Sequence, residues 1–144
     1  MCNGMRVFVV LLGLMLIGCQ TQAPKDTEIR TPTPDRLVAY QSKADGDATI
    51  VVTRDVGFTG GACLGDVFID GRVVAKLDTG ERAAFHVPSG NHVVGTWNTG
   101  SGLCGYRVGT DRKEVSVDLR PGDIRKFRIS INPDSGPEIN ATTL

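Results

Sequence analysis

The sequence predicts an all-β protein that folds as a single antiparallel β-sandwich of about seven short strands. Three observations predict this fold. Short runs of apolar and β-branched residues alternate with polar ones, turn signals rich in Gly, Pro, Asn and Asp recur about every 8–12 residues, and no window has a sustained helical period. A chain of 144 residues is expected to form one domain.

Composition excludes several classes of protein. Sixteen basic and sixteen acidic residues give zero net charge, and 40% of the residues are hydrophobic, which argues against a disordered chain. No block of Lys or Arg is present, so no nucleic-acid partner is expected. No apolar run is long enough for a membrane-spanning helix.

The first residues have the pattern of a signal peptide. Arg6 gives a short basic region, and the apolar run 7–17 has eleven residues, too few to span a bilayer. The run ends in Leu16-Ile17-Gly18-Cys19, which resembles the lipobox of bacterial lipoproteins. The resemblance implies that residues 1–18 are removed and that Cys19 is acylated, which anchors the protein to a membrane; several acyl chains on one residue hold far more firmly than one. An ordinary secretory signal with an incidental cysteine is the alternative.

The residue after Cys19 implies a location. Gln20 stands where, in enterobacterial sorting, Asp would retain a lipoprotein in the inner membrane. The resemblance therefore implies a lipid anchor in the outer membrane, with the protein on the periplasmic face; exposure at the cell surface is the alternative. Residues 19–45 are expected to be the lipidated cysteine and a flexible tether, because the stretch is rich in Pro and polar residues and has no apolar period.

The strands follow in order over residues 46–132, the expected sandwich domain. Asp70-Gly71 is the strongest hairpin signal, and Gly- or Pro-containing turns separate the later strands. The tail 133–144 is expected to be flexible, although Glu138-Ile139 could add an edge strand. The expected strands are 49–54, 67–69, 73–77, 82–87, 91–97, 114–119 and 126–131. Alternation assigns these residues to the core: Ile50, Val52, Val67, Ile69, Val73, Ala75, Leu77, Phe85, Val87, Val93, Trp97, Val115, Val117, Leu119, Phe127, Ile129 and Ile131.

The cysteines predict one disulfide. Of four, Cys2 leaves with the signal peptide and Cys19 carries lipid, so Cys63 and Cys104 remain as a pair in an oxidising compartment. A metal pair or a redox motif would need closer spacing or further ligands. The bond would join two glycine-rich loops and gather apolar side chains into a binding surface; alternatively, these residues only cap one end of the core. The candidate surface residues are Phe58, Leu64, Trp97, Leu103 and Tyr106.

Part of the domain resembles a PEGA-like repeat. The pattern is carried by VFIDGRVVAKL at 67–77, the turn 78–80 and VPSGNH at 87–92, while 50–54, Gly57-Phe58 and Cys63 resemble small bacterial lipoproteins with a domain of unknown function. The resemblance covers residues 48–131. It implies an extracytoplasmic sandwich of immunoglobulin-like or transthyretin-like type, and it brings no catalytic residues.

No enzyme chemistry is expected. His86 and His92 lack a third ligand at metal-site spacing, and Ser89 has no nucleophile elbow. We therefore expect no catalytic residue, metal or cofactor. The expected function is a non-enzymatic binding or adaptor module with a protein partner in the cell envelope. The alternative is an inhibitor or immunity lipoprotein that blocks a cell-wall-degrading or toxic enzyme, with Asp66 or Arg107 beside the disulfide as the residue to insert.

Overall fold

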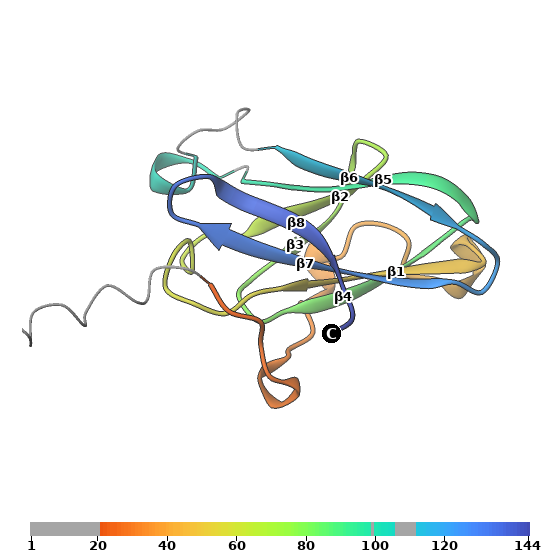
Figure 1. Ribbon diagram of the computed structural model, residues 1–144, viewed down its shortest axis with the longest axis horizontal. Helices are drawn as coiled ribbons and strands as arrows, with labels where there is room; N and C mark the ends of the chain where they lie inside the picture. The colour runs from red at the N-terminus through yellow and green to blue at the C-terminus, as the bar shows by residue number, and fades with distance from the viewer. Residues whose placement is uncertain (1–20, 99, 106–111) are drawn as a thin grey trace, which may run out of the picture.

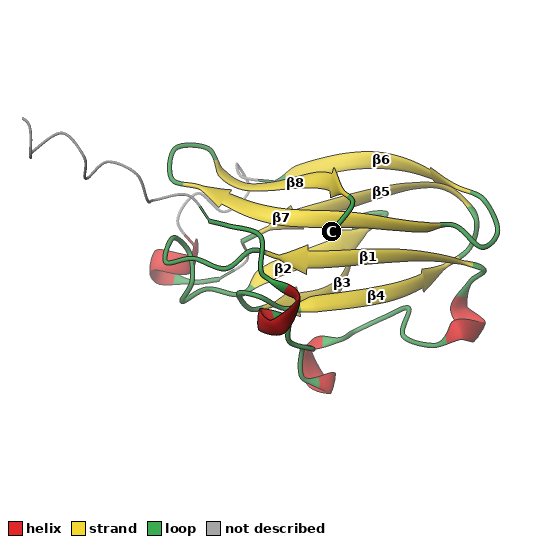
Figure 2. Ribbon diagram, turned by 60° about the horizontal axis from the view of Figure 1, so that its bottom comes forward, coloured by secondary structure: helices red, strands yellow, loops and turns green. Residues whose placement is uncertain are grey.

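The structure is a computed structural model that describes residues 21–98, 100–105 and 112–144. Eight strands and four short 3₁₀ helices are described, and the strands form two four-stranded sheets that pack face to face (Figures 1 and 2). The all-β sandwich predicted from the sequence is confirmed. The elements are η1 (Asp26–Glu28), η2 (Pro34–Arg36), η3 (Lys43–Asp45), β1 (Ala48–Arg54), β2 (Gly65–Ile69), β3 (Arg72–Leu77), β4 (Arg82–Val87), β5 (Gly90–Trp97), η4 (Gly102–Gly105), β6 (Lys113–Leu119), β7 (Ile124–Asn132) and β8 (Gly136–Thr142).

One strand pairing departs from the antiparallel expectation. The sheets have the orders β4-β1-β7-β8 and β3-β2-β5-β6, and β1 runs parallel to β7, with Val52 opposite Phe127. All the other pairings between named strands are antiparallel. A parallel pair needs a long crossover connection. The strands of the second sheet lie between β1 and β7 in the chain and supply that crossover.

The core lies between the sheets, and most of the residues expected there are buried. Val73 is an exception because a β-bulge interrupts the alternation: Val67 pairs with Ala75 and Phe68 with Val73, so the intervening Val74 enters the core instead. In β5 the expected face is also wrong. Val94 lies in the core, and Val93 and Trp97 are only partly buried on the outer face, because two adjacent valines leave the alternation ambiguous.

The segment expected to be a flexible tether lies against the sandwich from residue 21 onward. Leu37 forms a bridge with Ala75 of β3, and the Tyr40 carbonyl accepts a hydrogen bond from the His86 amide of β4. Leu37, Ala39 and Tyr40 also pack against the core. The segment therefore covers the two edge strands on one side of the sandwich. Unpaired backbone groups of these strands could otherwise pair with another chain.

The expected flexible tail also differs in the structure. Residues 136–142 form β8, an edge strand that pairs with β7 and places Ile139 opposite Ile129. Ile139 is buried in the core, which explains why this polar segment is held. Of the two expectations for this region, the edge strand at Glu138-Ile139 is the one the structure adopts.

Only a glycine fits at position 95, because the Phe68 ring packs against its Cα on the outer face of the second sheet. A Cβ at this position would lie 2.2 Å from the Phe68 ring and 2.8 Å from the Lys113 carbonyl. We predict that Gly95→Ala lowers the free energy of unfolding by about 1–3 kcal/mol, the usual cost of overpacking. Gly65→Ala is the matched control, since its Cβ would meet nothing nearer than 3.6 Å. Urea unfolding measures both; equal stabilities of the two variants would contradict the packing described.

Candidate functional site

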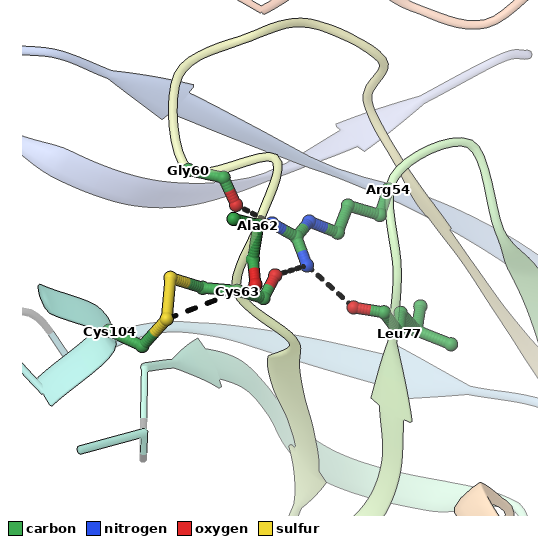
Figure 3. The surroundings of a disulfide bond; sticks show 6 residues. All are labelled: Arg54, Gly60, Ala62, Cys63, Leu77 and Cys104. Carbon is green, nitrogen blue, oxygen red and sulfur yellow. Dashed lines mark hydrogen bonds between the residues drawn. A yellow bond between two sulfur atoms is a disulfide. The ribbon is translucent and has the colours of Figure 1, made fainter. Parts of the chain in front are cut away.

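Arg54 organises one end of the sandwich. It ends β1 and is 1% exposed, and its guanidinium donates hydrogen bonds to backbone carbonyls instead of pointing into solvent. Nη1 donates to the carbonyls of Cys63 (2.5 Å) and Leu77 (2.6 Å), and Nη2 donates to that of Gly60 (2.8 Å) (Figure 3). We call residues 57–64 the end loop. Arg54 thus fixes the end loop at two points and joins it to the end of β3.

The charge on Arg54 is maintained despite burial. Desolvation lowers the pKa of Arg54, while the nearby charges of Asp78 and Glu81 raise it. An arginine keeps its proton throughout the accessible pH range. A buried donor or acceptor left without a partner costs about 1–3 kcal/mol. Without Arg54, the carbonyls would lose their hydrogen-bond donor, and without the carbonyls, the buried guanidinium would lose its acceptors.

The predicted disulfide is confirmed. Cys63 in the end loop is bonded to Cys104 in η4, with 5.4 Å between the Cα atoms. Gly60, in the same loop, has φ of +68°, a conformation that glycine adopts with little strain. The bond therefore ties the end loop to the second glycine-rich segment, as the sequence predicts.

The candidate binding residues have different environments. Phe58 is fully exposed (100%) and Leu64 is 40% exposed, so both present apolar surface from the end loop. Trp97 is half-buried on β5, where the Arg112 guanidinium lies 5.7 Å from its ring and 4.2 Å from that of Phe68. The Trp97 side chain is packed beneath the Arg112 guanidinium and is not free to contact a partner in this arrangement.

The other predicted site residues are described only in part. Leu103 lies in η4, and its side chain is outside the described part of the structure. Tyr106 and the lipidation candidate Cys19 lie outside the described residues altogether. The exposed apolar surface that the structure describes at this end is therefore that of Phe58 and Leu64.

A buried polar network fixes Thr21 beside the end loop. Its hydroxyl donates to the Asp55 carboxylate (3.0 Å) and accepts from the Ile131 amide (2.8 Å), and Arg128 binds the same carboxylate through two nitrogens. The hydrogen bond to Asp55 raises the pKa of Arg128, against desolvation. Sequence reasoning missed this network because a threonine in a polar segment carries no signal of burial.

The backbone continues this attachment. Gln22 and Val56 exchange two hydrogen bonds of 2.8 and 2.9 Å, and a Cβ on Gly57 would lie 3.1 Å from the Thr21 Cα. The described chain thus begins in contact with the end loop, at the end of the sandwich seen on the left of Figure 1. Thr21 is a fixed point of the domain and not part of a free tether.

A groove opens on the side of the sandwich opposite to the covered edges. It has a volume of about 840 Å³ and lies between β6 and the strands β7 and β8. Apolar side chains of both sheets line it, and Ile124 at its margin is 62% exposed. The lining residues are Val115, Ser116, Val117, Asp118, Ile124, Arg125, Lys126, Phe127, Ala141, Thr142 and Thr143. Sequence reasoning missed it, because it depends on how the edges of two sheets approach one another.

Both histidines lie within hydrogen-bonding distance of groups on neighbouring strands or turns. His92 joins two turns: Nδ1 lies 2.7 Å from Asp70 Oδ2 and Nε2 lies 2.7 Å from the Pro88 carbonyl. His86 Nδ1 lies 3.4 Å from the Thr49 hydroxyl. Within the described residues, no group of three or more His, Cys, Asp or Glu side chains is placed to hold a metal ion.

His92 predicts a pH-dependent stability. Both of its ring nitrogens face acceptors, and only the protonated ring can donate from both. Desolvation lowers the pKa of His92, but hydrogen bonds to Asp70 and Pro88 and the Asp70 charge outweigh it, so the pKa is raised above its ordinary value of 6.5. The stabilisation is therefore complete below pH 6.5 and is lost as pH rises through the folded-state pKa.

Urea unfolding at pH values between about 5.5 and 9 measures how the free energy of unfolding changes with pH. The decrease is expected at pH values above the ordinary pKa of histidine. We expect His92→Gln to flatten the profile and the control His86→Gln to leave it as in the wild type. A wild-type stability that rises across this range, or a slope that survives His92→Gln, would contradict the assignment.

The geometry thus offers two surfaces, the end loop and the β6–β8 groove. Among the residues described, no helix has the length and apolar content needed to cross a membrane. Comparison with protein-family models, curated proteins and solved structures found no match to this chain.

Proposed function

We propose that this chain is a lipid-anchored, non-enzymatic binding or adaptor module of the outer membrane, facing the periplasm, that takes an extended segment of an envelope protein in its β6–β8 groove. The single observation that carries the binding role is the contrast between the two sides of the sandwich. One side is covered by the chain's own residues 37–40, and the other is an open apolar groove.

The covered side indicates what the groove would bind. There, residues 37–40 place Leu37, Ala39 and Tyr40 against the core, and Leu37 forms a single bridge with the edge of β3. On the open side, Val115, Val117 and Phe127 offer the same kind of apolar floor between two sheet edges. Extended peptides bind such edges through main-chain hydrogen bonds, with alternate side chains entering the groove. The partner segment would therefore be apolar at alternate positions.

The anchor rests on the sequence. Leu16-Ile17-Gly18-Cys19 after a short apolar run is the lipobox-like pattern, and Gln20 favours the outer membrane. The PEGA-like resemblance of residues 67–92 favours the immunoglobulin-like or transthyretin-like type of sandwich and a role outside the cytoplasm.

Site-specific photo-crosslinking in cells tests the proposal. A photoreactive residue is placed at Ile124 on the groove margin or, as the control, at Val38, which has similar exposure (55%) but lies on the covered side beside β3. We expect one discrete protein adduct from position 124 and none from position 38. The Cys19→Ser form of each variant is expected to lose both the lipid label and its place in the outer-membrane fraction.

The arms of this experiment separate the two parts of the proposal. Equal adducts from positions 124 and 38, or none from 124, would contradict the groove as the binding surface. An unlabelled wild-type protein, or a Cys19→Ser form that stays in the outer-membrane fraction, would contradict the anchor.

A further inference from the structure

We propose that the end loop faces the membrane and that the Phe58 side chain contacts the lipid bilayer. This inference rests on the proposed lipidation of Cys19. It assigns the partner of the exposed apolar residues of the end loop, which is the bilayer surface, and it leaves the groove on the side of the sandwich for the protein partner.

Only a short stretch of chain separates the proposed lipid from the domain. Thr21 is buried and fixed by hydrogen bonds to Asp55 and Ile131. Cys19 precedes it by two residues, and two peptide units span at most about 7.6 Å at 3.8 Å each. The headgroup layer on each side of a bilayer is about 5–8 Å thick. An acylated Cys19 therefore holds Thr21 at the level of the headgroups or just above them.

The end loop lies directly beside Thr21. Gly57 approaches it so closely that an added Cβ would lie 3.1 Å from the Thr21 Cα, and Phe58 follows directly. The Phe58 ring is fully exposed, and Leu64 at the other end of the same loop is 40% exposed. Among the residues that the structure describes, the largest exposed apolar side chain thus lies beside the point where the proposed lipid anchor would join the domain.

The end loop is held in place by hydrogen bonds and a disulfide. Arg54 holds the carbonyls of Gly60 and Cys63, and the disulfide ties Cys63 to Cys104 (Figure 3). The loop therefore cannot easily fold Phe58 back onto the domain. One buried carboxylate next to this end is neutralised within the domain, since Asp55 is paired with Arg128. Phe and Leu occur on the apolar faces of peripheral segments that enter the boundary between headgroups and acyl chains, which is the depth that Phe58 would reach.

Tryptophan fluorescence in vesicles tests the contact. The mature protein, lipidated at Cys19, is reconstituted into vesicles of phosphatidylethanolamine and phosphatidylglycerol, with or without brominated acyl chains, which quench nearby indoles. Phe58→Trp is compared with Val38→Trp, an exposed position on the covered side beside β3. The wild-type signal from Trp97 is subtracted from both, and circular dichroism confirms that both variants are folded.

We expect the added emission of Phe58→Trp to be blue-shifted and mostly lost with brominated lipid, while that of Val38→Trp is unchanged. Vesicle-bound protein in which Phe58→Trp is quenched no more than Val38→Trp would overturn the bilayer contact and leave the anchor intact. Protein that does not remain with the vesicles would overturn the anchor and, with it, this inference.

Discussion

The arrangement of this protein depends on one buried cation. Arg54 comes at the end of the first strand, and its guanidinium binds three backbone carbonyls that belong to the end loop and to β3. The next residue, Asp55, binds Arg128 and Thr21. Of these two adjacent residues, Arg54 therefore holds the end loop, and Asp55 holds Thr21 against the domain. The end of the sandwich is built around this dipeptide, and the disulfide adds a second tie to a loop already bound.

The two sides of the sandwich are unequal, and this inequality is the basis of the functional account. Every two-sheet sandwich has edge strands whose unpaired backbone groups must be protected from pairing with another chain, and covering them with a segment of the same chain is one way to do so. Here the chain covers β3 and β4 with its own residues 37–40, in part through the bridge between Leu37 and Ala75, and leaves the groove between β6 and β8 open. With the proposed anchor at one end, the groove would run along a side that the proposed partner could approach without passing the membrane.

The sequence predicts the parts of this structure that depend on local chemistry. Alternation located seven strands and most of the core, Asp70-Gly71 forms the predicted turn with φ of 52° and 80°, and cysteine arithmetic predicted the disulfide. Features that depend on distant segments were missed. Thr21 and Leu37 are held by partners far along the chain. From the sequence alone, an arginine at the end of a strand is expected to be exposed to solvent, but the end loop buries Arg54. The groove has no local signal at all, because it exists only between sheets.

The most direct test of the central role of Arg54 is the backbone order of residues 58–64 measured by ¹⁵N NMR relaxation. Rigid backbone has order parameters of about 0.85, and flexible backbone falls below about 0.6. Lysine cannot replace the planar fork of arginine donors. We therefore expect a rigid loop in the wild type and in the double variant Cys63→Ser/Cys104→Ser, and a flexible loop in Arg54→Lys with its disulfide intact. A loop that remains rigid in Arg54→Lys, or becomes flexible only when the disulfide is removed, would contradict the account.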